Sequence, residues 1–141
     1  MIHKLVPALC ALALLIASCG SSAPETLPSD VQVTVDLKDS PYSIVLSPAT
    51  FKAGTIKFGI RNAGAMVHQF DLIKTDLAAD KLPTDAATAK AKEDGLVKQV
   101  LNIQPGKVAT VSADLQPGHY VIICNVAGHY QLGMHGDFTV R

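Results

Sequence analysis

Three side chains that can bind a metal are spaced evenly near the C-terminal end of the sequence. Cys124, His129 and Met134 follow one another at intervals of five residues and offer a thiolate, an imidazole and a thioether. One cysteine, two histidines and a weak axial methionine are the ligands of a type 1 copper site. The three residues therefore indicate such a site, provided that another part of the chain supplies a second imidazole.

Three further histidines follow the N-terminal segment, and they are not equivalent as candidates. His119 precedes Cys124 by five residues in a predicted strand, so it lies roughly 16 Å from the thiol at about 3.3 Å per residue. His135 is adjacent to Met134, and neighbouring side chains in an extended segment point apart. We expect both to be solvated. His68, which follows the turn Asn62-Ala63-Gly64, is the best remaining candidate.

The pattern along the chain predicts an all-β domain that positions these side chains. Short runs with alternating or β-branched residues are separated by turns rich in Gly and Pro, which is typical of a sandwich or Greek-key barrel. One segment rich in Ala and Lys, 84–94, predicts a surface helix or an irregular insertion. The predicted strands are 31–37, 42–46, 55–61, 67–73, 97–103, 108–115, 120–124 and 137–140.

The N-terminal residues are typical of an export signal. Lys4 precedes an apolar run over 5–17 that is short for a membrane span, and Ile16-Ala17-Ser18-Cys19 looks like a bacterial lipobox. An ordinary signal peptide or a short membrane anchor is the alternative. The lipobox predicts a signal peptide over 1–18, a lipidated Cys19 with a flexible tether over 19–29, and one domain over 30–141.

Charge and cysteine content narrow the possible functions. The chain has 12 basic and 12 acidic residues with no basic block, which argues against a nucleic-acid partner. It has three cysteines, and cleavage with lipidation would remove Cys10 and occupy Cys19. Cys124 is then the single remaining thiol, so no intrachain disulfide competes with metal binding.

Two motifs together resemble the cupredoxin, or blue copper, family. These are Asn62-Ala63-Gly64-Ala65-Met66-Val67-His68 and Cys124-x4-His129-x4-Met134, with flanks PGHYVIIC and GMHGDFTV that resemble the family's last two strands. The loop spacing is similar to the rusticyanin, auracyanin and sulfocyanin branch. Over roughly 30–141 the resemblance implies a cupredoxin-like barrel or sandwich of about eight strands. It also implies one copper ion, bound by His68, Cys124, His129 and Met134.

The resemblance also implies contacts around the ligands. The backbone N–H of the residue after the first histidine, here Gln69, is expected to donate to the cysteine sulfur. Many members of the family have Asn at that point, and we expect Asn125 to stabilise the loop instead. Electron entry is expected at the ring edge of His129, through an apolar docking surface formed by Met66, Val126, Ala127, Tyr130 and Leu132.

As a function, the resemblance implies the shuttling of single electrons by Cu(I)/Cu(II) cycling. The protein would be a lipid-anchored monomer in the bacterial periplasm or on the outer face of the cytoplasmic membrane, with a cytochrome, an oxidase or a reductase as partner. A copper chaperone or scavenger is the alternative, although the chain has three Met and no Met- or His-rich tract. Multicopper enzymes need histidines beside the cysteine, where this chain has Ile123 and Asn125. We therefore predict that it is not an enzyme.

Overall fold

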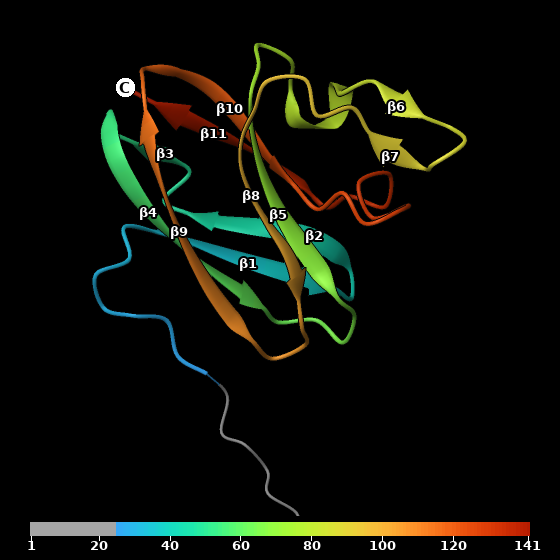
Figure 1. Cartoon of the computed structure of the whole chain (residues 1–141), viewed down its shortest axis with the longest axis horizontal. Helices are drawn as coiled ribbons and strands as arrows, with labels where there is room; N and C mark the ends of the chain where they lie inside the picture. The colour runs from blue at the N-terminus through green and yellow to red at the C-terminus, as the bar shows by residue number, and fades with distance from the viewer. Residues whose placement is uncertain (1–24) are drawn as a thin grey trace, which may run out of the picture.

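Two β-sheets packed face to face form the domain in the computed structural model, which describes residues 25–141 (Figure 1). The predicted signal peptide and Cys19 lie outside the described residues. One sheet has the order β2 (Tyr42–Ser47), β1 (Val33–Asp39), β4 (Gly54–Asn62) and β9 (Val108–Leu115). The other has the order β3 (Thr50–Phe51), β11 (His135–Val140), β10 (Gly118–Ile123), β5 (His68–Lys74) and β8 (Leu96–Ile103).

The prediction of an all-β domain is confirmed, because each predicted strand is present within a few residues of its expected ends. β1 and β4 pair in parallel, whereas β1–β2, β4–β9, β5–β8, β5–β10 and β10–β11 pair antiparallel. The short strand β3 was not predicted. It pairs in parallel with the end of β11 through two residues, which is too short for a periodic pattern to appear in the sequence.

The core lies between the two sheets and follows from the alternation of the strands. Val33, Val35 and Leu37 occupy every second position of β1 and are fully buried. Phe58 of β4 contacts two rings of the other sheet, Phe70 on β5 at 5.6 Å and Phe138 on β11 at 5.4 Å between ring centroids. These tilted and edge-on pairs fix how the sheets face each other.

An insertion between β5 and β8 covers the outer face of the second sheet (Figure 1). It contains the 3-10 turn η1 (Ala79–Lys81) and the two-stranded β6 (Thr84–Asp85) and β7 (Lys90–Ala91). Beneath it, a second apolar cluster joins the sheet to the insertion and the loop after β10. Its members are Ile73, Ala79, Leu82, Ala91, Val121, Ile123 and Tyr130.

Of the two alternatives predicted for 84–94, a surface helix and an irregular insertion, the structure has the irregular insertion. The Asp85 carboxylate accepts the N–H of Ala87 at 2.8 Å, and Ala89 has a positive φ of 52°. The peptide of Ala91 is bound on both sides by the Asn125 side chain, at 2.8 Å and 2.9 Å. Even the high helix propensity of alanine stabilises a short helix little when there is no apolar face to bury, so these contacts decide the conformation.

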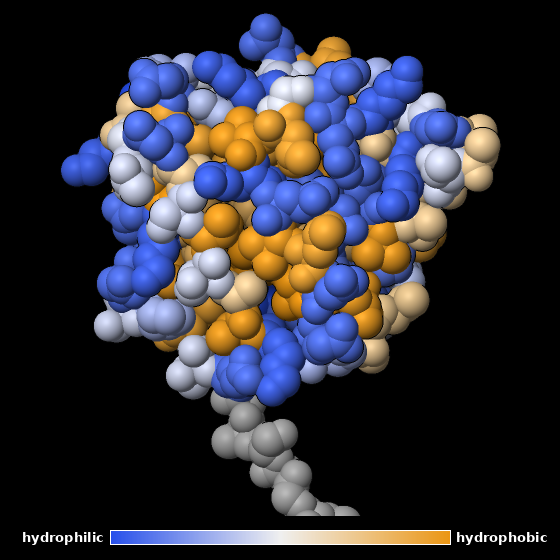
Figure 2. Space-filling model, viewed as in Figure 1, coloured by the Kyte–Doolittle hydropathy of each residue, from blue (hydrophilic) through white to orange (hydrophobic). Residues whose placement is uncertain are grey.

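The two sheets end side by side at β8 and β9, which are edge strands of different sheets. Figure 2 shows hydrophobic residues gathered in the middle of this face, bordered by hydrophilic ones. β8 contributes two exposed apolar side chains, Leu96 and Leu101. The apolar interior therefore comes close to the surface where these two edge strands meet.

The described part of the predicted tether already contacts the domain. The Glu25 carboxylate binds Lys107 Nζ at 2.7 Å and accepts the N–H of Val108 at 3.2 Å. Across residues 25–141, no helix is long and apolar enough to cross a bilayer. The boundary at residue 30 stays a prediction.

Candidate metal centre

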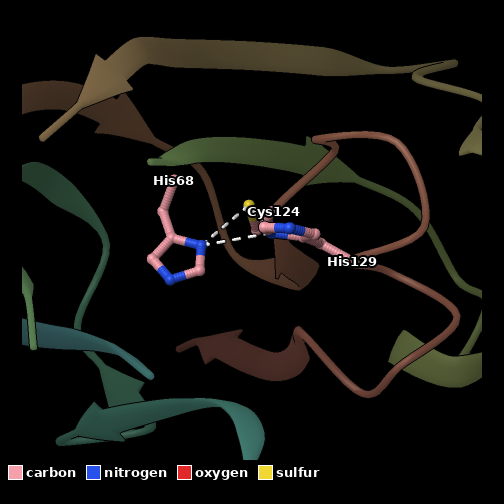
Figure 3. A group of neighbouring side chains, drawn as sticks. All are labelled: His68, Cys124 and His129. Carbon is pink, nitrogen blue, oxygen red and sulfur yellow. Dashed lines mark hydrogen bonds between the residues drawn. The ribbon is translucent and has the colours of Figure 1, made fainter. Parts of the chain in front are cut away.

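Neighbouring strands bring His68 and Cys124 to the same end of the second sheet. His68 is the first residue of β5, and Cys124 directly follows β10. These strands are antiparallel neighbours, with Ile123 opposite Asp71, so the start of one lies beside the end of the other. His129 comes from the loop between β10 and β11, and all three side chains point to a common centre (Figure 3).

The three donor atoms are as close as ligands of one small metal ion have to be. Nδ1 of His68 lies 3.2 Å from Nδ1 of His129. Sγ of Cys124 lies 3.7 Å from the first nitrogen and 3.5 Å from the second. Bonds of about 2.0 Å from imidazole and about 2.3 Å from thiolate, at angles of roughly 110° to 120°, separate such donors by about 3.3 to 3.7 Å. The site is therefore type 1 copper-like.

The loop after Cys124 folds back so that its first and last residues meet. The N–H of Cys124 donates to the backbone carbonyl of Met134 at 3.0 Å, and the N–H of Met134 donates to the backbone carbonyl of His129 at 3.1 Å. Gly128 and Gly133 have φ values of 82° and 113°, which side chains disfavour. Met134 is fully buried in the main core with Cys124. The even spacing in the sequence thus corresponds to a closed loop.

Backbone donors surround the cysteine sulfur. The N–H of Gln69 donates to Sγ at 3.3 Å, which is the contact implied by the sequence resemblance. Burial raises the pKa of the Cys124 thiol, while the N–H groups of Gln69 and Val126 act in the opposite direction. A bound metal ion would displace the thiol proton, because thiolate is the ligating form.

Burial also favours the neutral form of both histidines, which is the form that binds a metal ion. His68 is fully buried and His129 is 3% exposed. Burial lowers the pKa of His68, with a further lowering by His129 and an opposing effect of Asp39. Burial likewise lowers the pKa of His129, again opposed by Asp39. The donor types, spacing and protonation states all fit a copper ion.

Solved structures of similar shape are blue copper proteins and their relatives. The auracyanin of the photosynthetic bacterium Roseiflexus castenholzii, in dithionite-reduced form, has a TM-score of 0.55 and 22% identity over 79% of this chain and 98% of its own. Auracyanin A of Chloroflexus aurantiacus, a "blue" copper protein, has a TM-score of 0.52 and 20% identity over 77% of this chain and 98% of its own. A rusticyanin variant has a TM-score of 0.60 and 20% identity over 77% of this chain and 76% of its own.

This chain has the cupredoxin fold. No protein-family model matches the sequence, and no curated protein is similar to it. The fold is thus shown by shape, while the sequence identities are low. The cupredoxin fold accounts for the architecture around the site, where one histidine comes from mid-chain and the rest of the site from the loop before the last strand.

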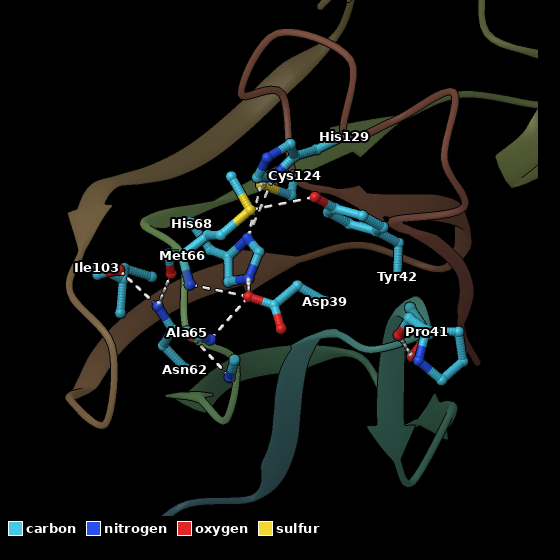
Figure 4. Close-up of polar contacts among 12 residues, drawn as sticks. Asp39, Pro41, Tyr42, Asn62, Ala65, Met66, His68, Ile103, Cys124 and His129 are labelled. Atoms are coloured by element: carbon cyan, nitrogen blue, oxygen red, sulfur yellow. Dashed lines mark hydrogen bonds and ion pairs between the residues drawn. The ribbon is translucent and has the colours of Figure 1, made fainter.

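The loop before His68 is held by two polar side chains (Figure 4). Asn62 donates to the carbonyls of Met66 at 2.7 Å and Ile103 at 2.8 Å, and its Oδ1 accepts the N–H of Gly64 at 2.9 Å. Asp39, at the end of β1, accepts the N–H groups of Ala65 at 2.7 Å and Met66 at 2.8 Å. These bonds fix the backbone that presents the first histidine.

Asp39 and Tyr42 were not found by sequence reasoning, although both contact predicted site residues. The Tyr42 hydroxyl donates to Sδ of Met66 at 3.1 Å, and its ring lies 5.1 Å from the ring of His129. Both residues lie more than 20 positions before His68, at the end of β1 and at the start of β2. The alternating pattern predicted a strand that ends at residue 37, so nothing in the sequence indicated that Asp39 lies near the site.

The predicted docking residues divide into two groups. Leu132 is 57% and Met66 is 47% exposed, Ala127 is also exposed, and Val126 is partly buried. Tyr130 is 5% exposed, and its hydroxyl donates to the carbonyl of Ala79 and accepts the N–H of Leu82, each at 2.9 Å. Tyr130 therefore offers no exposed ring, and it fastens the insertion to the loop after β10.

The remaining predicted residues lie outside the donor cluster. Asn125 binds Ala91 and donates to Glu93 at 2.6 Å, so it joins the metal loop to the insertion. His119 is part-buried, with contacts to the carbonyl of Thr75 at 2.7 Å and to Asp137 at 3.0 Å. His135 packs on the ring of Tyr130 at 5.3 Å. Neither of these two histidines joins the metal centre, but neither is simply solvated.

Proposed function

We propose that this protein carries single electrons by cycling one type 1 copper ion between Cu(I) and Cu(II). The observation that supports this is the buried cluster of His68, Cys124 and His129, whose donor atoms all lie within 4.8 Å of one another. Met134 is the proposed axial ligand. A copper ion in such a site supplies a one-electron couple.

The protein's own residues would make this couple fast and specific. The closed loop and the hydrogen bonds of Asn62 and Asp39 hold the donors in one arrangement. A fixed arrangement limits the rearrangement that accompanies a change of oxidation state. Because the three donors are at most 3% exposed, neither water nor a second protein reaches the centre directly.

Burial of the ligands favours electron transfer over the alternative of a copper chaperone. A chaperone passes its ion to another protein and needs donors that a partner can approach. Here the loops that carry the ligands expose apolar groups, among them Met66, Ala127 and Leu132. They suit a small, short-lived contact with a redox partner such as a cytochrome, an oxidase or a reductase. Electrons would then pass through His129.

We further propose that the protein is exported and held at a membrane by lipid on Cys19. The lipobox-like Ile16-Ala17-Ser18-Cys19 supports this assignment, with residues 1–18 removed, a tether over 19–29 and the copper domain over 30–141. Acyl chains add about 0.8 kcal/mol of membrane affinity per buried CH2. The location would be the periplasm or the outer face of the cytoplasmic membrane. The intact mass of membrane-extracted protein would reveal whether Cys19 carries acyl groups.

Copper loading tests the proposed function directly. Titration with Cu(II) should produce an intense visible band from thiolate-to-copper charge transfer, saturating at one ion per chain. The band should disappear in Cys124→Ala and change strongly in His129→Gln. His119→Gln is the matched control and should leave it intact, because His119 lies outside the cluster. A colourless protein with Cu(II), or a Cu(I) form that resists oxidation, would contradict the carrier role.

A further inference from the structure

The second ring nitrogen of His68 is buried beside a carboxylate. While Nδ1 faces Cys124 and His129, Nε2 has no hydrogen-bond partner among residues 25–141. Oδ2 of Asp39 lies 3.7 Å from Nε2, and the Asp39 side chain is only 12% exposed. Figure 4 shows Asp39 below the ring, on the side away from the donor cluster.

The chemistry of metal-bound histidine explains what Nε2 needs. When one nitrogen binds a metal, the other carries the proton and usually donates it to a carboxylate, a carbonyl or water. At 3.7 Å the contact is longer than a hydrogen bond. It nevertheless places a carboxylate oxygen beside Nε2, and a shift of less than 1 Å would bring the two atoms within hydrogen-bond distance.

The direction of β1 explains why Asp39 reaches this position. Side chains of a strand alternate between its faces, and Val33, Val35 and Leu37 form the inward row. Asp39 continues that row at the end of the strand. Its oxygen Oδ2 accepts the N–H groups of Ala65 at 2.7 Å and Met66 at 2.8 Å, and these bonds hold the carboxylate in place.

Gly64 leaves the space that the contact requires. A Cβ atom at this position would lie 2.6 Å from Oδ2 of Asp39 and 2.9 Å from Nε2 of His68. Both distances are too short for any side chain unless one of the partners moves. Carboxylate, imidazole and glycine are therefore fitted to one another, and the contact is a built feature of the site.

We propose that Asp39 is a positioning residue for the copper centre. It holds His68 in the form with the proton on Nε2, which leaves Nδ1 free to bind the ion. Its negative charge beside this ligand stabilises Cu(II) relative to Cu(I) and so lowers the reduction potential. The inference rests on the proposed copper function and adds a residue that sets its potential.

The test compares two substitutions that remove the same charge from the same strand. Asp39→Asn keeps an oxygen that can accept the N–H groups of Ala65 and Met66 but loses the charge. Asp36→Asn is the matched control, because Asp36 faces outward and binds Arg61 at 2.8 Å and 2.9 Å. Spectroelectrochemical titration of each copper-loaded variant gives its potential, and therefore the ratio of its Cu(II) and Cu(I) affinities.

We expect Asp39→Asn to shift this ratio toward Cu(I) by at least tenfold more than Asp36→Asn does. That corresponds to a rise of about 59 mV for a one-electron couple. A smaller difference between the variants overturns the assignment. A merely structural role of Asp39 would lower thermal stability without this selective shift.

Nitrogen NMR of the wild-type Cu(I) protein gives a second test that needs no variant. We expect the Nε2 proton of His68 to be strongly deshielded by a hydrogen bond to the Asp39 carboxylate. A proton shift like that of a solvent-exposed imidazole overturns the inference even if Asp39→Asn does not fold. Failure of the proposed function would look different, because the wild-type protein would then develop no charge-transfer band with Cu(II). A normal band together with equal potentials in both variants would refute only the role of Asp39.

Discussion

Gln69 contacts the metal centre and a buried carboxyl group at the same time. Its backbone N–H donates to Sγ of Cys124 at 3.3 Å, and its side-chain Nε2 donates to Asp71 at 2.6 Å. The pairing of β5 with β8 shifts register between His68 and Phe70, so Gln69 has no partner opposite it in that ladder. On its other side β5 pairs with β10 only as far as Asp71 and Ile123, so the N–H of Gln69 lies beyond that ladder and donates to the sulfur.

The hydrogen bond to the sulfur makes Gln69→Pro an informative substitution at the residue scale. Proline removes the N–H donor, and here the lost hydrogen bond is the one to the thiolate. The sulfur then donates more strongly to Cu(II), so we expect the visible band to move to longer wavelength and the potential to fall. The fall should be on the order of 50 mV, since such bonds contribute about 1 kcal/mol or more.

Gln69→Ala is the control for that experiment. It keeps the backbone N–H and loses only the side-chain contact with Asp71. We expect the position of its visible band to stay near that of the wild type. A Gln69→Pro protein that folds correctly and has an unchanged spectrum would show that this N–H does not tune the centre.

At the scale of elements, the insertion over 75–95 depends on the loop that carries the metal ligands. Asn125 follows Cys124 and binds the peptide of Ala91, while Tyr130 follows His129 and binds Ala79 and Leu82. Each ligand is thus next to a residue that fastens the insertion. The covering of the outer sheet face and the shape of the metal loop support each other.

Tyr130→Phe tests this connection. Removal of the hydroxyl leaves the carbonyl of Ala79 and the N–H of Leu82 without their buried partner. We expect the free energy of unfolding to fall by about 1–3 kcal/mol, because unsatisfied buried groups are costly. Urea denaturation followed by circular dichroism would measure the loss.

Tyr42→Phe is the matched control for the loss of a hydroxyl. Within residues 25–141 the hydroxyl of Tyr42 makes one hydrogen bond, to the thioether of Met66 at an exposed position, and thioether sulfur is a weak acceptor. We expect its stability to change by less than about 0.5 kcal/mol. Equal effects of the two substitutions would mean that Tyr130 does not anchor the insertion.

At the scale of the whole molecule, one buried carboxyl group links stability to pH. Asp71 is fully buried on β5, and its Oδ1 has no hydrogen-bond partner among the described residues. Burial raises the pKa of Asp71 from 3.8 to about 6, against a lowering by the hydrogen bond from Gln69. The folded state therefore binds this proton more tightly than the unfolded state does.

The sign of the effect follows from that difference. Below about pH 4, Asp71 is protonated in both the folded and the unfolded state, so its ionisation does not reduce the free energy of unfolding. Between about pH 4 and 6 the unfolded state loses the proton first, so stability falls as the pH rises, and above 6 the cost is complete. A shift of this size corresponds to about 3 kcal/mol.

Asp71→Asn should remove this pH dependence, because the amide resembles the protonated acid and does not titrate. In copper-free protein, the variant should gain up to about 3 kcal/mol relative to the wild type between pH 4 and pH 8. Denaturant unfolding at several pH values would measure the difference. Asp114→Asn, at an exposed position of β9, controls for the loss of one charge. A pH-independent difference for Asp71→Asn would contradict the expectation.

Local patterns in the sequence were sufficient for the strands and for the kinds of metal donor. Alternation predicted the core row of β1, and the turn residues predicted where the strands end. The types and spacing of Cys124, His129 and Met134 indicated a metal site, and elimination singled out His68. These features depend on short-range periodicity and on ligand chemistry, and a sequence records both directly.

Tertiary structure alone decided which side chains support those donors. Asp39 reaches His68 because β1 and the loop after β4 meet at one end of the sandwich, and Tyr130 turns inward because the insertion covers its face. The segment 84–94 adopts its form because Asn125, over 30 residues later, binds its backbone. Such contacts join positions far apart in the chain, and their strength depends on burial, which no local pattern expresses.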